Sequence, residues 1–514
     1  MSFLVRTGRF AGLALAVLPA LAQAQPLPPQ NRLFDEAMQA ARSVSDQGDR
    51  EDAYARIAEA RVRARDFAAA RTLLRHIRDP ELRGEATENC ALVSSYMDRF
   101  AEALEFARSL QDDGRKAQTL GRVAREQARA GDFAAALRIA QEVAPVDARV
   151  LTYAFISEIA TRAGETNVAA STMAETMATM ARIPDQGLKD TMATIVAAAR
   201  ARAGDYVGAG ETIRTISNVE ARIGALAELA TIALAANARN AANDVADSLA
   251  GIEREGQNEA DRVRLLIEAS QLKARVGDTG AADTLIREAI EAVPRVEGEA
   301  ERHDAEARVA AALVRGDATA ALAYARAITD RTGRDQAIAG IANALALIGR
   351  AADALALVPE INEQPFRDDA RRRAALALAA SNVQQAIEAA QPAAPPLRNA
   401  IYVAIVESRS SAGDATGTLA AAAKVEDVQI RDAALATAAR TLARQHRNAD
   451  GARRVAERIG VRELRDDVMV DVIETEARAG NLAGALASAR GLRAPSQRAI
   501  ALAVVAARLG RPAQ

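Results

Sequence analysis

The sequence predicts an all-α protein, built as an α-solenoid of antiparallel helix pairs. Half of its 514 residues are apolar, most of them alanine, whereas aromatic residues make up 3% and tryptophan is absent. Alanine favours helices and lets two helices approach closely. A second observation is a recurring phrase: AGDFAAALRIAQEV at 130–143 returns in altered form at 203–216, 412–425 and 479–492. A third is the regular spacing of that phrase along the chain.

The Gly-Asp pair of this phrase marks a turn that recurs every 32 to 40 residues, most often every 33. A nearly constant period over the whole chain indicates a solenoid, in which each unit packs only on its neighbours. The turn position is occupied by Arg65, Asp98, Gly131, Gly164, Gly204, Asn237, Gly277, Gly316, Gly349, Ser381, Gly413, Arg447 and Gly480.

Three further positions keep the same register. Five residues after the turn stands Ala in every unit but one, where Thr418 takes its place, so two helices are expected to touch there. Seven residues after a recurring base the side chain is apolar, and Cys90 at this position is predicted to be a buried hydrophobe rather than a nucleophile. The bases are Arg50, Arg83, Lys116, Arg149, Lys189, Arg222, Arg262, Arg302, Arg334, Arg367, Arg398, Arg431, Arg465 and Arg498.

Each unit is therefore predicted to hold two helices. Helix A begins near the base, as in 149–163, and buries an apolar stripe. Gly131 ends such a helix because glycine accepts the left-handed conformation, and Asp132 caps the next one. Helix B follows, as in 133–143. A short connection makes the two helices antiparallel neighbours.

These residues resemble a tetratricopeptide repeat. The resemblance extends over about 34–512 and implies thirteen or so full units and a partial last one, wound as a right-handed superhelix with helix A on its concave face. The units lack the family's Trp and late Tyr in helix A and the Pro that closes the repeat. The residues that carry the resemblance are Leu120, Ala124, Gly131, Asp132, Phe133, Ala136 and Leu137.

Three intervals of about 40 residues, starting at Gly164, Asn237 and Gly277, carry about seven extra residues each. Seven residues are about two helical turns. Helix B is therefore expected to extend in these units and to form a protruding ridge. Met173, Met177 and Met180 lie at helical spacing in the first of them, either as core filler or as a binding surface.

The N-terminus indicates export. Arg6 and Arg9 precede the apolar run 11–21, and an A-x-A site follows at 22–24, as in a secretory signal peptide. We expect a signal peptide at 1–24, a Pro-rich linker at 25–33 and the solenoid at 34–512; a buried first helix is the alternative for the apolar run. The expected location is the periplasm, with secretion as the alternative.

Composition and motifs argue against several functions. Without Arg6 and Arg9 the chain has 64 basic and 68 acidic residues, whereas a nucleic-acid binder needs clustered excess Lys and Arg. The three histidines fall at unrelated repeat positions, and no known spacing for a metal site, nucleophile or phosphate loop is present. We therefore expect no enzyme activity, no cofactor, no metal, no transmembrane segment and no nucleic-acid partner.

The row of bases allows two interpretations. It could bind an anionic polymer, or it could stabilise the units, because acids accompany most of the bases and a cation suits the negative C-terminal end of helix B. The structural interpretation is favoured. A second basic row at the end of helix A, which includes Arg129 and Arg478, is explained by the same dipole argument.

In tetratricopeptide repeats helix A lines the binding groove. The resemblance therefore implies that the side chains two and nine residues after each base face this groove. The ninth row is Glu59, Arg125, Glu158, Gln271, Asn343, Glu407, Arg440 and Glu474, and these are the candidate partner-binding residues. The second row is Asp52, Glu85, Gln118, Arg264, Asp304, Gln336, Asp369 and Asp467. The predicted function is a non-enzymatic scaffold that binds a protein or peptide of the cell envelope. The alternative is a peptidoglycan or polysaccharide sensor, against which the scarcity of stacking aromatics argues.

Overall fold

The computed structural model of the protein describes residues 27–252 and 258–509. Within these two ranges the regular elements are 28 α-helices and two short 3₁₀ helices, η1 (Val293–Arg295) and η2 (Val358–Glu360), with no strand. The all-α prediction is therefore confirmed. No helix in the described ranges has the length and apolar character needed to cross a membrane.

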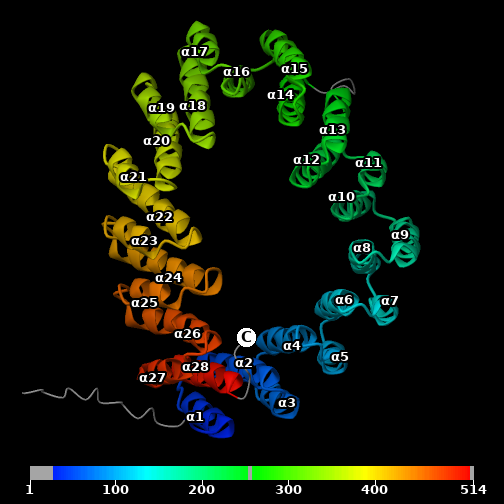
Figure 1. Ribbon diagram of the computed structural model, residues 1–514, viewed down its shortest axis with the longest axis vertical. Coiled ribbons are helices and arrows are strands. Elements are labelled where there is room, and N and C mark those ends of the chain that lie inside the picture. Colours follow the sequence, from blue (N-terminus) through cyan, green and yellow to red (C-terminus); the bar gives the residue numbers. More distant parts are fainter. Residues whose placement is uncertain (1–26, 253–257, 510–514) are drawn as a thin grey trace, which may run out of the picture.

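The helices form two concentric rows around a ring (Figure 1). The even-numbered helices lie on the inner side and are called the inner helices; the odd-numbered helices lie on the outer side and are called the outer helices. The inner helices are α2 (Gln47–Arg63), α4 (Pro80–Ser95), α6 (Asp113–Arg129), α8 (Val146–Arg162), α10 (Gln186–Arg202), α12 (Val219–Ala235), α14 (Glu259–Val276), α16 (Glu299–Leu313), α18 (Arg331–Leu347), α20 (Gln364–Ala379), α22 (Pro395–Ser411), α24 (Val428–Arg444), α26 (Arg462–Arg478) and α28 (Pro495–Arg508). The outer helices are α1 (Gln30–Arg42), α3 (Phe67–Leu74), α5 (Phe100–Ser109), α7 (Phe133–Glu142), α9 (Thr166–Met180), α11 (Tyr206–Arg214), α13 (Arg239–Ile252), α15 (Thr279–Ala292), α17 (Ala318–Ala327), α19 (Ala351–Leu357), α21 (Val383–Ala390), α23 (Ala415–Ala422), α25 (Ala449–Ala456) and α27 (Leu482–Gly491).

The turns between inner and outer helices follow the sequence prediction. The backbone has a positive φ at eleven of the thirteen predicted turn positions, and Gly316 and Ser381 are the exceptions. At Gly131 φ is +90°, and Asp132 then caps α7 by accepting the backbone N–H of Ala135 at 3.0 Å. The predicted roles of the Gly-Asp pair, a helix stop and a helix cap, are confirmed here.

The small residue five positions after each turn is buried in every unit, from Ala70 through Ala136 to Thr418 and Ala485. The predicted apolar position of the inner helices is buried as well, and Cys90 is fully buried there. Because a small side chain lets two helices approach closely, these positions form the contact between the two rows of helices. The predicted core register is therefore confirmed.

The predicted extension of helix B in the longer units is also confirmed. The outer helices α9, α13 and α15 have 15, 14 and 14 residues, whereas α7 has 10. Met180 is buried, and Met173 and Met177 pack against the same core, so this methionine row is core filler.

Several bases of the predicted row bind the end of the preceding outer helix. The Arg50 guanidinium donates to the Val44 carbonyl at 2.7 Å, and Arg149 donates to the Val143 carbonyl at 2.8 Å. Arg498 does the same with the Leu492 carbonyl at 2.8 Å. In each pair the acceptor lies six residues before the base, among the carbonyl groups that a helix end leaves without partners. These contacts support the structural interpretation of the row.

A buried acid directly after the base links one unit to the next, a contact that the sequence pattern does not reveal. Asp335 is fully buried, and one of its oxygens accepts the backbone N–H groups of Asn362 and Glu363 at 2.9 and 2.8 Å. These groups lie at the entry to α20, the next inner helix. We call these acids the staple carboxylates. Glu51, Asp190, Asp335 and Asp432 are buried, and Asp466, which makes the same contact, is half-buried.

The two ends of the described chain meet and close the ring (Figure 1). The outer helix α1 packs against the inner helix α28, and α28 also packs against α2. Leu33 and Phe34 of α1 are buried in this contact. The expectation of a superhelix that ends in a partial unit is therefore corrected, because the last inner helix receives its outer partner from the N-terminus.

This closure also changes the boundaries expected from the sequence. Helix α1 begins at Gln30, inside the expected linker 25–33 and before the expected start of the repeats at residue 34, and Pro29 precedes its first turn. Proline is compatible with a helix start because its missing N–H has no acceptor there. The predicted signal peptide at 1–24 lies outside the described residues.

Candidate binding site at the ring closure

The eight candidate partner-binding residues lie on eight different inner helices. They are Glu59 on α2, Arg125 on α6, Glu158 on α8, Gln271 on α14, Asn343 on α18, Glu407 on α22, Arg440 on α24 and Glu474 on α26. Because the chain closes into a ring, residues far apart in the sequence approach one another at the closure. Glu59 and Arg440 line a common cavity there, and the charge of Arg63 on α2 acts on Glu474.

Several candidates away from the closure join neighbouring inner helices. Glu158 pairs with Arg202 of α10, with 3.3 Å between carboxylate and guanidinium. The Asn343 amide donates to Asp369 of α20 at 3.1 Å. Polar side chains that were expected to contact a partner thus hold one unit to the next.

The remaining candidates differ in their exposure. The Arg125 guanidinium lies over the Phe155 ring, 4.0 Å from its centre, and burial lowers the pKa of Arg125. Gln271 is half-buried, whereas Glu407 is exposed. The candidates thus differ in exposure along the inner face, and three of them, Glu59, Arg440 and Glu474, lie near one another at the closure.

The cavity at the closure has a volume of about 290 Å³. Five inner helices form it, from both ends of the chain: α2 and α4 on one side, and α24, α26 and α28 on the other. Its walls are mostly charged, and no aromatic side chain is among the lining residues that the structure describes. The lining residues are Asp52, Ala55, Arg56, Glu59, Leu82, Glu85, Ala86, Asn89, Arg440, Arg444, Asp467, Val470, Asp471 and Ile500.

The arginines of the cavity are held by acids. Arg440 pairs with Asp467 and with Asp471, the latter at 3.6 Å, and Arg444 pairs with Asp471 at 2.7 Å. On the opposite wall Glu59 lies 3.7 Å from Arg56. Because each arginine already has a carboxylate partner, the cavity offers little free positive charge to an anionic ligand.

Two acids of the cavity have no such partner. Within the described chain, Asp52 and Glu85 have neither a hydrogen bond nor a salt bridge to their carboxylates. Both side chains are exposed at the rim of the cavity. Partial loss of solvent still raises the pKa of Asp52; Arg56 opposes this, and the negative charges of Asp467 and Glu85 add to it. A raised pKa means that the ionised carboxylate is disfavoured where it stands. A cation placed between Asp52 and Glu85 would relieve this unfavourable charge.

The sequence pattern contains these residues but does not group them. Asp52, Glu85 and Asp467 belong to the row two residues after the base, and Glu59 and Arg440 belong to the candidate row. The periodicity places each of them on the inner face, but it does not show that α2 and α26 become neighbours. One sequence signal of closure is the amphipathic segment at Gln30–Arg42, which precedes the first base and therefore belongs to no predicted unit.

Comparisons with known proteins give little information about function. No family model and no curated protein matches the chain. Among solved structures, Ton1535 from Thermococcus onnurineus NA1 has 13% identity and a TM-score of 0.25, covering 75% of this chain and 98% of its own. A circular tandem repeat protein with novel repeat topology and enhanced subunit contact surfaces has 12% identity and a TM-score of 0.15, covering 93% and 95%. TM-scores this low carry no functional argument.

Proposed function

We propose that this protein is a non-enzymatic scaffold that binds a protein or peptide at its inner face, with a basic side chain of the partner in the closure cavity. The observation that carries the proposal is the pair of acids without partners, Asp52 and Glu85, in a cavity whose arginines are already paired. The proposal includes a location in the cell envelope, in the periplasm or secreted, reached through the signal peptide at 1–24.

The proposal also retains the tetratricopeptide-like nature of the units. In that family helix A lines the concave face, and here the inner helices correspond to helix A. Divergent units of this kind, wound right-handed with a period of about 33 residues, would present one row of inner helices to a partner. The ring brings both ends of that row to one cavity.

Charge and composition favour a basic peptide over a sugar. A lysine ammonium or an arginine guanidinium between Asp52 and Glu85 would gain charge-assisted hydrogen bonds that the free protein lacks. Polysaccharide sites rely on aromatic side chains that stack on the sugar rings, and the cavity lining holds none among the described residues. The cavity also spans two ends of the chain, so an occupant would hold the closure together.

The test uses the full chain and a set of synthetic peptides that differ only in their number of Lys and Arg residues. Isothermal titration should detect binding of the basic peptides, with an affinity that falls as salt is raised. The double variant D52N/E85Q should bind them about tenfold more weakly or worse, since it loses two charge-assisted contacts of about 1.4 kcal/mol in total or more.

A matched control removes the same charge elsewhere. Glu211 and Asp283 are exposed on the outer helices α11 and α15, and E211Q/D283N changes the net charge by the same amount as D52N/E85Q. The control should bind the peptides as the unaltered protein does. Equal binding by both double variants would contradict the closure cavity as the site. Retention of the protein on isolated peptidoglycan, with no binding of any peptide, would contradict the scaffold itself.

A further inference from the structure

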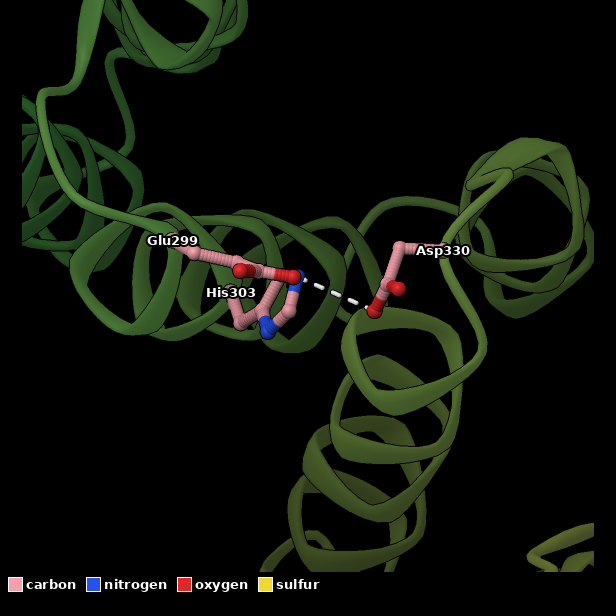
Figure 2. Close-up of side chains that lie close together, drawn as sticks. All are labelled: Glu299, His303 and Asp330. Carbon is pink, nitrogen blue, oxygen red and sulfur yellow. Dashed lines mark ion pairs between the residues drawn. The ribbon is translucent and has the colours of Figure 1, made fainter.

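A group of metal-ligating side chains lies where α16 meets the start of α18, at another part of the ring. Glu299 and His303 project from the first turns of α16, and Asp330 lies in the connection directly before α18 (Figure 2). One ligand atom from each residue lies within 4.8 Å of the other two. The sequence expectation of no metal site missed this group because Asp330 comes 27 residues after His303.

The imidazole of His303 is buried but incompletely satisfied. His303 is 5% exposed, and its Nε2 has no hydrogen-bond partner within the described chain. That nitrogen lies 3.0 Å from an oxygen of Asp330, an ion-pair contact drawn in Figure 2 that does not have hydrogen-bond geometry. A buried polar atom without a hydrogen bond costs free energy, so an ion that coordinates this nitrogen would be stabilised there.

The acids beside the imidazole supply negative charge. The Asp330 carboxylate accepts the backbone N–H of Gly333 at 2.8 Å and lies beside the imidazole. Glu299 is exposed, and its carboxylate lies beside the imidazole (Figure 2). A third acid, Glu306, has a buried oxygen without a hydrogen-bond partner, and burial raises the pKa of its carboxyl.

The other charged and titratable neighbours are few. Arg302 of α16 is close enough to lower the pKa of Glu306, and Arg331 and Arg334 lie at the start of α18, directly after Asp330. Tyr324 of α17 has its pKa raised to about 12, mainly by burial, and remains neutral. Gly333 packs closely against the imidazole, since a Cβ there would come within 2.7 Å of both Glu306 and His303. The acids beside this closely packed imidazole favour a small cation over a larger ligand.

We propose that Glu299, His303 and Asp330 bind one divalent transition-metal ion, with Zn²⁺ as the representative. One imidazole nitrogen and two carboxylate oxygens form a ligand set that suits Zn²⁺ and its neighbours in the series better than Ca²⁺ or Mg²⁺, which prefer oxygen ligands alone. Bonds of about 2.0–2.2 Å to such an ion require modest convergence of the three ligand atoms, which rotation of the exposed Glu299 side chain provides.

The position of the group gives the ion a structural consequence. His303 belongs to one inner helix and Asp330 to the cap of the next, so the ion would join two neighbouring units across α17. Three protein ligands leave a fourth position for water. Metal binding would therefore stabilise the α16–α18 contact, and it does not depend on the proposed peptide binding at the closure.

The experiment treats the full chain with a chelator and then titrates it with ZnCl₂ by isothermal calorimetry. We expect one saturable site per chain and a rise in the thermal unfolding midpoint. E299Q changes an exposed side chain and should fold normally, yet weaken Zn²⁺ binding at least about tenfold. H303Q should abolish saturable binding, and MgCl₂ at the same concentration should not replace ZnCl₂.

The control is H446Q. His446 is exposed, contacts the Ser411 carbonyl and lies in the turn after α24, far from the group, so its loss should leave Zn²⁺ binding unchanged. NMR of the imidazole nitrogens adds a direct readout, because Zn²⁺ should shift the His303 resonances and not those of His446. Stoichiometric binding that E299Q and H303Q leave intact would overturn the proposal. So would the absence of any saturable binding of Zn²⁺.

Discussion

Gln30 in the first described helix and Ala506 in the last are joined by a hydrogen bond, with the side-chain amide of Gln30 donating to the Ala506 carbonyl at 2.9 Å. The two residues are 476 positions apart in the sequence. Glu36 and Arg490 add an ion pair of 3.0 Å between the same two ends. The ring is thus closed by side chains and not only by the proximity of its ends.

Most of the closure energy should come from apolar burial. Phe34 is 1% exposed and carries the Arg61 guanidinium over its ring, 4.0 Å from the ring centre. We predict that F34A destabilises the closure by about 3–5 kcal/mol, the usual cost of removing a buried phenylalanine side chain. Because repeat units interact mainly with their neighbours, the loss should be local. Hydrogen exchange should accelerate in α1 and α28, and small-angle scattering should show an opened particle.

The ion pair at the same closure provides a control. Arg490 is 48% exposed, and a surface pair contributes about 0–1 kcal/mol. R490A should therefore leave the exchange rates of α28 nearly unchanged. If F34A and R490A had equal effects, or if α28 kept its protection in F34A, apolar packing by α1 would not be what closes the ring.

The sequence predicted the structure of a single repeat unit better than the arrangement of the units around the ring. Local chemistry determines where Gly131 turns the chain, where Asp132 caps a helix and where Ala136 must be small, and these were predicted correctly. Closure depends on the small rotation between neighbouring units, summed around the whole ring, and no residue type reports that rotation. For the same reason the meeting of Asp52 with Asp467, and of His303 with Asp330, could not be read from spacing.

The staple carboxylates should contribute to the contact between units. Asp335 is fully buried and accepts two backbone N–H groups from the entry to α20. We predict that D335A destabilises the protein by about 2–3 kcal/mol, because it leaves those donors without their acceptor. Urea denaturation followed by circular dichroism measures the change.

An exposed acid nearby gives the comparison. Asp353 is 54% exposed and pairs with Arg350 at 2.7 Å, so D353A should cost about 1 kcal/mol or less. Similar losses in D335A and D353A would show that the buried carboxylate is not a special link between α18 and α20.

Two staple carboxylates should also shape the acid stability of the protein. The backbone N–H of Asp79 is the main cause that lowers the pKa of Glu51. Burial raises the pKa of Asp190, but the N–H groups of Asn218 and Ser217 outweigh it, so the net shift is downward. A carboxyl with a lowered folded pKa gives full stabilisation above its unfolded value, about 4.3 for Glu and 3.9 for Asp. This stabilisation is lost as the pH falls through the folded pKa.

We therefore predict that the free energy of unfolding of the unaltered protein falls steeply below about pH 4.5, and that E51Q/D190N shows a shallower fall over the same range. The double variant should be less stable at neutral pH, where the carboxylates are ionised. Denaturation curves between about pH 3 and pH 7 provide the measurement. Parallel curves for the two proteins would be incompatible with these pKa shifts.

The turns between inner and outer helices allow backbone strain to be added at one position and removed at another. Gly131 has φ +90°, and no atom lies within 4 Å of the place that a Cβ would take, so G131A should lose stability through the backbone alone, by about 1–2 kcal/mol. Arg447 is exposed and holds the same kind of turn with φ +51°. R447G should raise stability by up to about 1 kcal/mol, because relief of the left-handed strain exceeds the extra chain entropy of glycine. The thermal unfolding midpoints of both variants measure these changes. A loss of stability in R447G would mean that contacts of the arginine side chain stabilise the turn by more than its left-handed backbone destabilises it.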